Sequence, residues 1–198
     1  MAWQKLVLAS KNPGKIRELQ ALLAETGIEV IGLDPAYPDV EETGTTFEEN
    51  AMIKARAACK ATGLPVLGED SGIVVDALHG EPGVRSARWV PGSDADRMYA
   101  LLKRMEGVPE RKRTGRYVSV IAVVTPSGTE RIFGATMDGK IGHEPRGTGG
   151  FGYDPIFVVD GKRTVAELSL EEKNRISHRA KALAKVMAHL PKLLEEQA

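Results

Sequence analysis

The fold is decided near the start of the chain, in residues 5–23, which read KLVLASKNPGKIRELQALL. Residues 5–9 form a short β-prone run, and apolar residues then recur at the spacing of one helix face, at Ile16, Leu19, Leu22 and Leu23. Asn12 can cap this helix and Pro13 can take its first position, where a missing N–H costs nothing. The stretch therefore predicts a strand, a tight loop and a helix.

Strands and helices alternate along the rest of the chain until hairpin strands appear. Further helices are expected at residues 46–62, 93–105 and from 177 onward, and strands at residues 28–33, 66–67, 73–75, 116–124, 131–137 and 156–159. The segment from Gly68 to Gly72 is interpreted as a turn and that from Gly142 to Asp154 as a glycine-rich loop. We expect an α/β protein with a mixed sheet, forming a single domain over residues 1–198 without a separable linker.

The charge balance excludes long polyanions as partners. The chain has 198 residues with 27 Lys+Arg and 27 Asp+Glu, whereas binding duplex nucleic acid needs a cationic surplus. No apolar run approaches the ~18 residues of a membrane span, and the run before Lys11 is too short for a signal peptide. Cys59 is the single cysteine, which suits a reducing cytosol. We expect a cytoplasmic globular protein without nucleic-acid or membrane partners.

Two stretches match phosphate-binding signatures in letters but not in context. Gly147–Gly152 fits G-x-G-x-x-G, but a strand follows where that fingerprint needs a helix. Gly134–Lys140 fits the first seven positions of a P-loop, yet Ile141 has no hydroxyl for magnesium and Gly142 opposes a helix. Neither match predicts a nucleotide site.

Three other groups of residues can carry chemistry. The loop Ser10–Lys15 offers backbone N–H groups, a helix dipole and two lysines to a phosphate, or is merely a capped helix with solvated lysines. Glu42 and Asp70 can supply the carboxylates that Mg²⁺ prefers, or are merely solvated. Cationic side chains gather near the expected start of the last helix: Lys173, Arg175, His178, Arg179 and Lys181. The helix dipole disfavours cations at this end, so the group indicates a bound anion such as a phosphate. Alternatively, Arg175 and Lys181 face water and the histidine has a structural role.

Eight motifs, taken in order, resemble the inosine/xanthosine triphosphate pyrophosphatase family over about residues 5–190. They are Ser10-Lys-Asn-Pro-Gly-Lys15, Glu41-Glu-Thr-Gly44, Glu49-Asn-Ala51 with Lys54, Glu69-Asp-Ser-Gly72, Pro82-Gly83 with Ser86-Ala-Arg88, Gly149-Gly-Phe-Gly-Tyr-Asp-Pro155, Glu172-Lys173 and Ser177-His-Arg179. The resemblance implies hydrolysis of ITP, dITP and XTP to the monophosphate and pyrophosphate, with Mg²⁺, by a cytosolic homodimer. It also implies an elongated mixed sheet flanked by helices, with two lobes and the active site in the cleft between them.

The resemblance also assigns the site residues. It gives the triphosphate to Ser10, Lys11, Asn12, Pro13, Gly14 and Lys15, and the metal to Glu42 and Asp70, with Asp70 as the general base. It places Asn50, Lys54 and Ser71 on the phosphate side, Phe151, Gly152, Tyr153 and Asp154 at the nucleoside, and Lys173, His178 and Arg179 at phosphate and purine. Arg179 has only donors, so it matches the C6 carbonyl of hypoxanthine and xanthine and leaves the amino group of adenine without a partner.

Two departures and two alternatives remain at this stage. The family often has Asp-Asp where this chain has Glu69-Asp70, which leaves open whether Glu69 is a second metal ligand, and Arg85 replaces a usual aromatic residue. One alternative is a related pyrophosphatase for another modified base, such as a methylated pyrimidine. The other is a nucleotide sensor without turnover. Glu42 and Asp70 argue against a sensor, because without a catalytic role two carboxylates beside a triphosphate would only repel the ligand.

Overall fold

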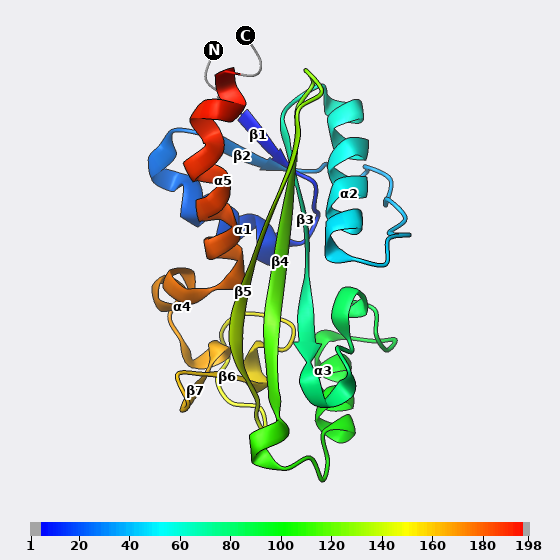
Figure 1. Cartoon of the computed structure of the whole chain (residues 1–198), viewed down its shortest axis with the longest axis vertical. Helices are drawn as coiled ribbons and strands as arrows, with labels where there is room; N and C mark the ends of the chain where they lie inside the picture. The colour runs from blue at the N-terminus through cyan, green and yellow to red at the C-terminus, as the bar shows by residue number, and fades with distance from the viewer. Residues whose placement is uncertain (1–4, 196–198) are drawn as a thin grey trace. The chain divides into compact units, whose positions relative to one another are not determined.

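The computed structural model describes residues 5–195 and confirms the predicted α/β class (Figure 1). Its helices are α1 (Pro13–Leu23), α2 (Phe47–Thr62), α3 (Asp94–Arg104), α4 (Leu170–Ile176) and α5 (His178–Glu195). Its strands are β1 (Lys5–Leu8), β2 (Glu29–Gly32), β3 (Val66–Val75), β4 (Thr114–Val124), β5 (Glu130–Ile141), β6 (Phe157–Val159) and β7 (Arg163–Thr164). No helix in this described part is both long and apolar enough to cross a membrane.

Within residues 5–195 the strands form one mixed sheet in the order β2-β1-β3-β4-β5-β6-β7. β1 lies between β2 and β3 and is parallel to both, while β6 runs antiparallel to β5 and β7. β1 ends at Leu8, which pairs with Leu67 of β3. The loop that follows β1 therefore leads toward the next residues of β3, where Glu69 and Asp70 lie.

The chain divides into two compact units, which we name unit 1 (Met1–Asp70, Ser119–Ala135 and Arg179–Ala198) and unit 2 (Ser71–Val118 and Thr136–His178). The apolar core of unit 1 joins side chains of β1, α1 and α5 around Leu67 and Ile121. The core of unit 2 forms around Ile73, Leu101 and Phe157. Each unit thus has a hydrophobic core of its own, and the cleft implied by the resemblance stays a prediction.

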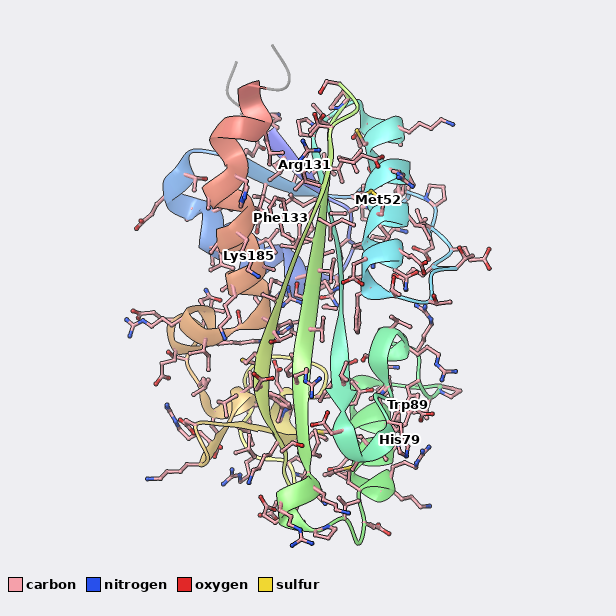
Figure 2. The ribbon with its side chains drawn as sticks, viewed as in Figure 1. Met52, His79, Trp89, Arg131, Phe133 and Lys185 are labelled. Atoms are coloured by element: carbon pink, nitrogen blue, oxygen red, sulfur yellow. The ribbon has the colours of Figure 1, made fainter. Side chains whose placement is uncertain are left out.

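In unit 1, α5 packs beside β5. Figure 2 labels Lys185 of α5 and Phe133 of β5. Lys185 donates from Nζ to the carbonyl oxygen of Gly134 at 2.5 Å, and the rings of His189 and Phe133 lie 5.1 Å apart. No role was predicted for His189, and the structure shows that it contacts Phe133 where α5 packs on β5.

Local caps begin and end the helices where the sequence placed them. The Asn12 side chain caps α1, and capping boxes begin α2 at Thr46 and α3 at Ser93. Gly63 ends α2 with a φ of 64°, a conformation that glycine adopts without strain. The predictions for these helices are confirmed, because each rested on hydrogen bonds between residues close in sequence.

The predicted turn from Gly68 to Gly72 is wrong. The segment is the middle of β3, which continues through it and is buried along nearly all its length. Gly68 is needed for packing, since a Cβ there would lie 2.2 Å from the carbonyl oxygen of Ala51 on α2. Glycine and charged residues usually mark exposed turns. In this segment the glycine lets α2 pack closely against β3, and the charged side chains have buried partners.

A separate helix, α4, precedes the C-terminal helix, and the sequence analysis did not separate the two. Lys173 and Arg175 lie in the last turn of α4, where the helix dipole favours cations. Ser177 ends α4, and α5 begins at His178. The argument that cations crowd a single helix N-terminus is therefore wrong for Lys173 and Arg175.

Candidate active site

Asp70 is the centre of a cluster of polar and charged side chains in unit 1. Its side chain is buried, and Oδ1 lies 2.8 Å from Nζ of Lys54. The same ammonium group lies 2.7 Å from Oε1 of Glu42. Lys54 belongs to α2 and Glu42 to the loop before it, so three segments of the chain bring two carboxylates and one cation together.

Asn50 holds Asp70 from α2. Its side chain is fully buried, Nδ2 donates to Oδ2 of Asp70 at 3.4 Å, and Oδ1 accepts from the N–H of Gly44 at 2.9 Å. Residues four apart share a helix face, and in the structure both Asn50 and Lys54 reach the carboxylate of Asp70. The Asn50 amide contacts protein groups at both ends and links the loop before α2 to Asp70. Ser71 follows Asp70 on β3 and is partly exposed.

Burial and charge act against each other in this cluster. Burial raises the pKa of the Asp70 carboxyl, and Lys54 opposes that effect without cancelling it. Burial alone would lower the pKa of Lys54, but Asp70 and Glu42 outweigh it and raise the pKa. One ammonium thus contacts both carboxylates, and the charge of Lys15 also acts to lower the pKa of Asp70.

The loop after β1 is a capped helix start, in which several amides are already bonded. Oδ1 of Asn12 accepts from the N–H groups of Gly14 at 2.8 Å and Lys15 at 3.3 Å, and Oγ of Ser10 accepts from the N–H of Asn12 at 3.1 Å. Pro13 has no N–H to offer. This conformation does not support the predicted use of these amides for phosphate, and it leaves that task to the lysine side chains.

The two lysines of the loop have different surroundings. Nζ of Lys11 lies 2.9 Å from Oδ1 of Asp39, an exposed carboxylate. Lys15 is mostly buried, and its Nζ lies 3.4 Å from Oε2 of Glu69. Burial lowers the pKa of Lys15, and Glu69 opposes that shift. Lys15 is thus a cation held in the interior beside β3.

Arg179 begins the unit 1 part of α5 and is 2% exposed. Its Nε donates to Oε1 of Glu69 at 2.9 Å, and its Nη1 forms an ion pair with Oε2 of Glu18. The guanidinium is therefore held between two buried carboxylates. Its predicted role at the purine base stays a prediction.

In unit 2, Asp154 organises the glycine-rich loop. The residue is buried; Oδ2 lies 2.8 Å from Nζ of Lys173 and accepts from the N–H of Phe151 at 3.0 Å, while Oδ1 accepts from the hydroxyl of Tyr117 at 3.0 Å. Gly150 leaves room for this carboxylate, because a Cβ there would lie 2.0 Å from Oδ2. Asp154 thus contacts its own loop and α4, rather than standing exposed to a ligand.

The remaining predicted residues of the loop divide into exposed and buried side chains. Phe151 is partly exposed, with its ring centre 4.9 Å from Nζ of Lys173. Gly152 donates its N–H to Oδ2 of Asp94 at 3.0 Å. Tyr153 is buried and donates to the carbonyl oxygen of Ser86 at 2.9 Å, and burial raises its pKa to about 12. Only Phe151 and Gly152 of these three keep partly exposed surface.

His178 is the last residue of unit 2 and is buried. Its ring stacks on that of Tyr117 with centroids 4.8 Å apart and planes inclined by 7°. Tyr117 also donates to Asp154, so one tyrosine connects the histidine with the glycine-rich loop.

Sequence reasoning missed four residues that hold the predicted ones in place: Glu18, Ser119, Tyr117 and Asp94. Two of them carried a signal. Glu18 interrupts the apolar face of α1, and Ser119 interrupts the apolar run from Tyr117 to Val124 of β4; both are buried. A polar side chain at a core position usually has a buried partner, and Glu69 is such a partner for Ser119 at 3.0 Å.

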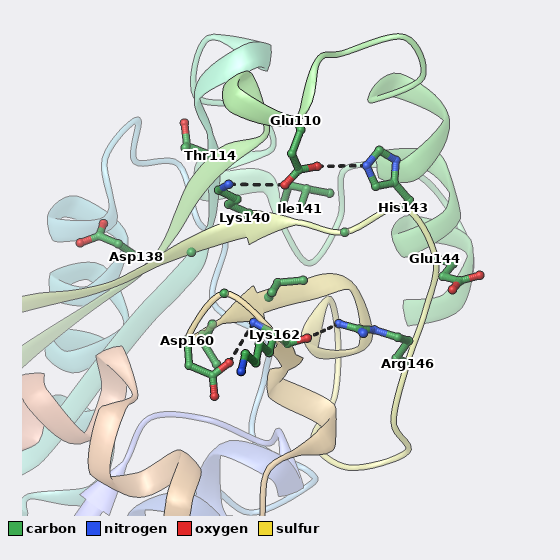
Figure 3. A pocket seen from close by; sticks show the side chains of 15 residues that line it. Glu110, Thr114, Asp138, Lys140, Ile141, His143, Glu144, Arg146, Asp160 and Lys162 are labelled. Carbon is green, nitrogen blue, oxygen red and sulfur yellow. Dashed lines mark hydrogen bonds and ion pairs between the residues drawn. The ribbon is translucent and has the colours of Figure 1, made fainter.

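Unit 2 also has a pocket of about 610 Å³ between the end of β5 and the turn that joins β6 to β7 (Figure 3). Its rim charges contact one another: Glu110 lies 3.4 Å from Lys140 and 3.1 Å from His143, and Arg146 donates to the carbonyl oxygen of Lys162 at 2.6 Å. None of the predicted site residues lines this pocket. The pocket and the predicted chemistry are therefore separate features.

Glu42 and Asp70 fit the requirements of Mg²⁺. This ion prefers oxygen ligands and is typically held by one or two carboxylates together with substrate phosphates and water. Both carboxylates contact a single ammonium group, at 2.7 and 2.8 Å, so one cation can reach both. Residues 5–195 contain no group of three or more His, Cys, Asp or Glu that could hold a metal.

The fold and the site together define an α/β protein with a carboxylate pair suited to a divalent cation and buried lysines suited to phosphate. Comparison with known proteins gives its family. The chain belongs to the Ham1 family, whose model matches residues 6–189.

Similar proteins agree with this assignment. A dITP/XTP pyrophosphatase of Symbiobacterium thermophilum is 66% identical over 196 residues, which cover 99% of this chain and 100% of that protein. A dITP/XTP pyrophosphatase of Geobacillus kaustophilus is 50% identical over 92% of each chain. The solved structure of a HAM1 protein from Coxiella burnetii is 43% identical, covers 97% of this chain and 100% of its own, and has a TM-score of 0.85. The resemblance stated from the motifs is confirmed.

Proposed function

We propose that this chain hydrolyses deaminated purine nucleoside triphosphates, namely ITP, dITP and XTP, to the nucleoside monophosphate and pyrophosphate. Its class, nucleoside-triphosphate pyrophosphatase, follows from Ham1 membership and from 66% identity to a protein of that name. In the structure, the observation that supports it most is the convergence of Asp70 and Glu42 on one ammonium at 2.8 and 2.7 Å.

Asp70 is the proposed general base. It accepts a proton from water as the water oxygen bonds to the α-phosphorus, and the bond from that phosphorus to the bridging oxygen breaks so that pyrophosphate leaves. The raised pKa of Asp70 makes it a stronger base than an ordinary aspartate. Asn50 and Lys54 orient its two oxygens.

Charge on the triphosphate is offset by this chain's cations and by the metal. Glu42 and Asp70 would hold Mg²⁺, which when bound neutralises charge on phosphate oxygens. Lys11 and Lys15 bind phosphate through their ammonium groups, at the positive end of the α1 dipole. The other residues of the loop, Ser10, Asn12, Pro13 and Gly14, fix the positions of these two lysines. Ser71 offers a hydroxyl beside Asp70.

The resemblance assigns the nucleoside to the glycine-rich loop, and we propose that Phe151 to Asp154 act there. Phe151 offers a ring to the base, and Gly152 offers backbone that can approach closely. Tyr153, Asp154 and Lys173 keep that loop in shape through the contacts described above. His178 and the donors of Arg179 are proposed to select the C6 carbonyl over an amino group.

The wider assignments come from the resemblance. We propose that residues 1–198, of which 5–195 are described, form one catalytic domain that acts as a cytoplasmic homodimer. Size-exclusion chromatography with light scattering tests the dimer, and a mass near the monomer value of 21.4 kDa would contradict it.

The deciding experiment assays ITP, dITP, XTP, GTP, ATP and a methylated pyrimidine triphosphate with purified protein and Mg²⁺. We expect pyrophosphate, rather than orthophosphate, and turnover of ITP and XTP far above that of ATP, while GTP, which shares the C6 carbonyl, tests whether the 2-amino group is excluded. Orthophosphate as product, or equal turnover of ATP and ITP, would overturn the proposal. Titration calorimetry that shows ITP binding without any turnover would instead favour a sensor.

Arg179→Lys tests the base-selecting part. The lysine keeps a positive charge for Glu18 and Glu69 but loses the planar array of donors. We expect the ratio of kcat/KM for ITP to that for ATP to fall at least tenfold. An unchanged ratio would remove Arg179 from base selection.

A further inference from the structure

Glu69 and Asp70 are neighbours in sequence but face opposite sides of β3. Successive side chains of a strand alternate between its two faces. Asp70 contacts Lys54 of α2, whereas Glu69 contacts Lys15 of α1 and Arg179 of α5. Figure 1 shows α2 on one side of β3 and α1 and α5 on the other. The two carboxylates of the acidic pair therefore contact different side chains of unit 1, although the charge of Lys15 also acts on Asp70.

The Glu69 carboxylate is fixed on several sides. The residue is 1% exposed. Oε1 accepts from Oγ of Ser119 at 3.0 Å and from Nε of Arg179 at 2.9 Å, while Oε2 lies 3.4 Å from Nζ of Lys15. A carboxylate in these surroundings is committed to two cations and a hydroxyl.

The two cations depend on Glu69 to different degrees. Arg179 has a second buried carboxylate beside it, Glu18. The ion pair that holds Lys15 in the interior is the one with Glu69. Removing Glu69 would take away the largest favourable influence on the Lys15 charge, leaving Asp70 to favour that charge against burial, Lys54 and Arg179.

We propose that Glu69 is a positioning residue of the triphosphate site, which fixes the Lys15 ammonium for phosphate, and that it is not a ligand of the metal. The proposal rests on the proposed function, since Lys15 matters only if a phosphate binds there. It resolves the question that the Glu69-Asp70 pair raised in the sequence: one carboxylate of the pair serves the metal side of β3, and the other serves a lysine on the opposite side.

The first test compares Glu69→Gln with Glu42→Gln. For Glu69→Gln we expect KM for ITP to rise about 10- to 100-fold, kcat to change less than about threefold, and the Mg²⁺ concentration for half-maximal activity at saturating ITP to stay within twofold. For Glu42→Gln we expect the Mg²⁺ requirement to rise at least tenfold. A matching rise in Glu69→Gln would make Glu69 a metal ligand and overturn the proposal.

The second test is a double-mutant cycle read by binding alone. Calorimetry with inorganic pyrophosphate in EDTA gives affinities of wild type, Glu69→Gln, Lys15→Met and the double variant. If Glu69 acts through Lys15, we expect the Glu69 change to weaken binding at least tenfold in wild type and less than twofold in the Lys15→Met background. Equal losses in both backgrounds would overturn the proposal.

Two milder variants keep the test decisive if Glu69→Gln folds poorly. Ser119→Ala removes one hydrogen bond from Glu69 and keeps the charge, so we expect a two- to fivefold rise in KM in the same direction. Glu69→Asp shortens the arm and keeps the charge, so we expect partial recovery of pyrophosphate affinity relative to Glu69→Gln; no recovery counts against the proposal. If wild type released no pyrophosphate from ITP, the proposed function would fail, while the calorimetric cycle would still decide the coupling between Glu69 and Lys15.

Discussion

Asp70 in unit 1 and Asp154 in unit 2 have nearly the same immediate surroundings. Asp70 is 5% exposed and Asp154 is 4% exposed. Each has a lysine ammonium 2.8 Å from one of its oxygens, Lys54 in the first case and Lys173 in the second. By burial and by their strongest contact alone, the two carboxylates look interchangeable.

The difference lies in the remaining partners. Asp154 also accepts from the Tyr117 hydroxyl and the Phe151 N–H, so both of its oxygens have neutral donors from the same unit. Asp70 has one further donor, the Asn50 amide at 3.4 Å, and shares Lys54 with Glu42. Asp154 thus has a lysine and two neutral donors, whereas Asp70 has one neutral donor, shares Lys54 with Glu42 and also feels the positive charge of Lys15.

This difference separates a structural ion pair from a site. A buried carboxylate with a full set of donors stabilises its loop and has little reason to exchange partners. A cluster with surplus negative charge can accept a divalent cation and can take up a proton. Burial and an ion pair therefore do not identify a catalytic carboxylate; the balance of charge and donors around it does.

The largest expected effect is on turnover when Asp70 becomes neutral. In Asp70→Asn we expect kcat for ITP to fall by about 10²- to 10⁴-fold, the range of general acid–base catalysis. Burial raises the pKa of Asp70, so the fold does not gain from its charge, and the unfolding midpoint should stay within about 4 °C. Pyrophosphate release and circular dichroism measure the two quantities. Turnover within tenfold of wild type would exclude Asp70 as the base.

The corresponding change in unit 2 should affect stability first. Asp154→Asn leaves Lys173 buried without its carboxylate, which typically costs about 3–5 kcal/mol and lowers the unfolding midpoint by roughly 10 °C at this size. We expect KM for ITP to rise about tenfold as the loop loosens, with a smaller effect on kcat, measured by steady-state kinetics.

Asp154→Asn combined with Lys173→Met provides the matched control. Removing both partners of a buried pair is usually less costly than removing one, so we expect the double variant to unfold at a higher temperature than Asp154→Asn. The same double change at Asp70 and Lys54 should restore no turnover. If Asp154→Asn kept its stability but lost turnover as Asp70→Asn does, the contrast between the two aspartates would collapse.

A smaller effect is expected in the pH dependence of KM for ITP, because the pKa of Lys15 is lowered. Burial lowers the pKa of Lys15 from 10.5, and the positive charges of Lys54 and Arg179 lower it further. Glu69 and Asp70 of β3 raise this pKa but do not outweigh the lowering. Lys15 is charged below its lowered pKa, so we expect KM for ITP to rise with pH before an ordinary lysine would titrate. The folded state also binds fewer protons than the unfolded state in that window, so the Lys15 contribution to stability rises with pH there.

Lys15→Arg is the control for the pH effect, because a guanidinium stays protonated throughout this range. We expect its KM to be flat with pH over the same interval. A KM that rises equally in wild type and in Lys15→Arg would assign the effect to another group.

The smallest effect is expected at the pocket of unit 2. Lys140→Ala removes an exposed ion pair with Glu110, and such pairs contribute about 0–1 kcal/mol. We expect kcat/KM for ITP to stay within twofold of wild type and the unfolding midpoint to move by less than about 4 °C. A change in KM above fivefold would connect this pocket with the nucleotide and weaken the assignment of the site to Asp70.

The sequence predicted the elements whose signals are local. Asn12, Thr46 and Ser93 marked the starts of three helices, and the i, i+4 spacing of Asn50 and Lys54 placed both on one helix face. It failed in the middle of β3, where Gly68 and the charges after it indicated a turn. That failure has a tertiary cause. Gly68 is needed for the close packing of α2 on β3, and the charged residues after it form ion pairs with residues far away in sequence.

The sequence by itself determined the α/β class, the helix caps and, through its ordered motifs, the family. Those features depend on residue order and on contacts within a few positions. Only the tertiary structure decided which face of β3 each acidic residue takes, that Arg179 is held by Glu18 and Glu69, and that Asp154 accepts from Tyr117 and Phe151 while Asp70 shares Lys54 with Glu42. The reason is that the charge state and role of a buried group depend on partners that folding brings together from distant segments.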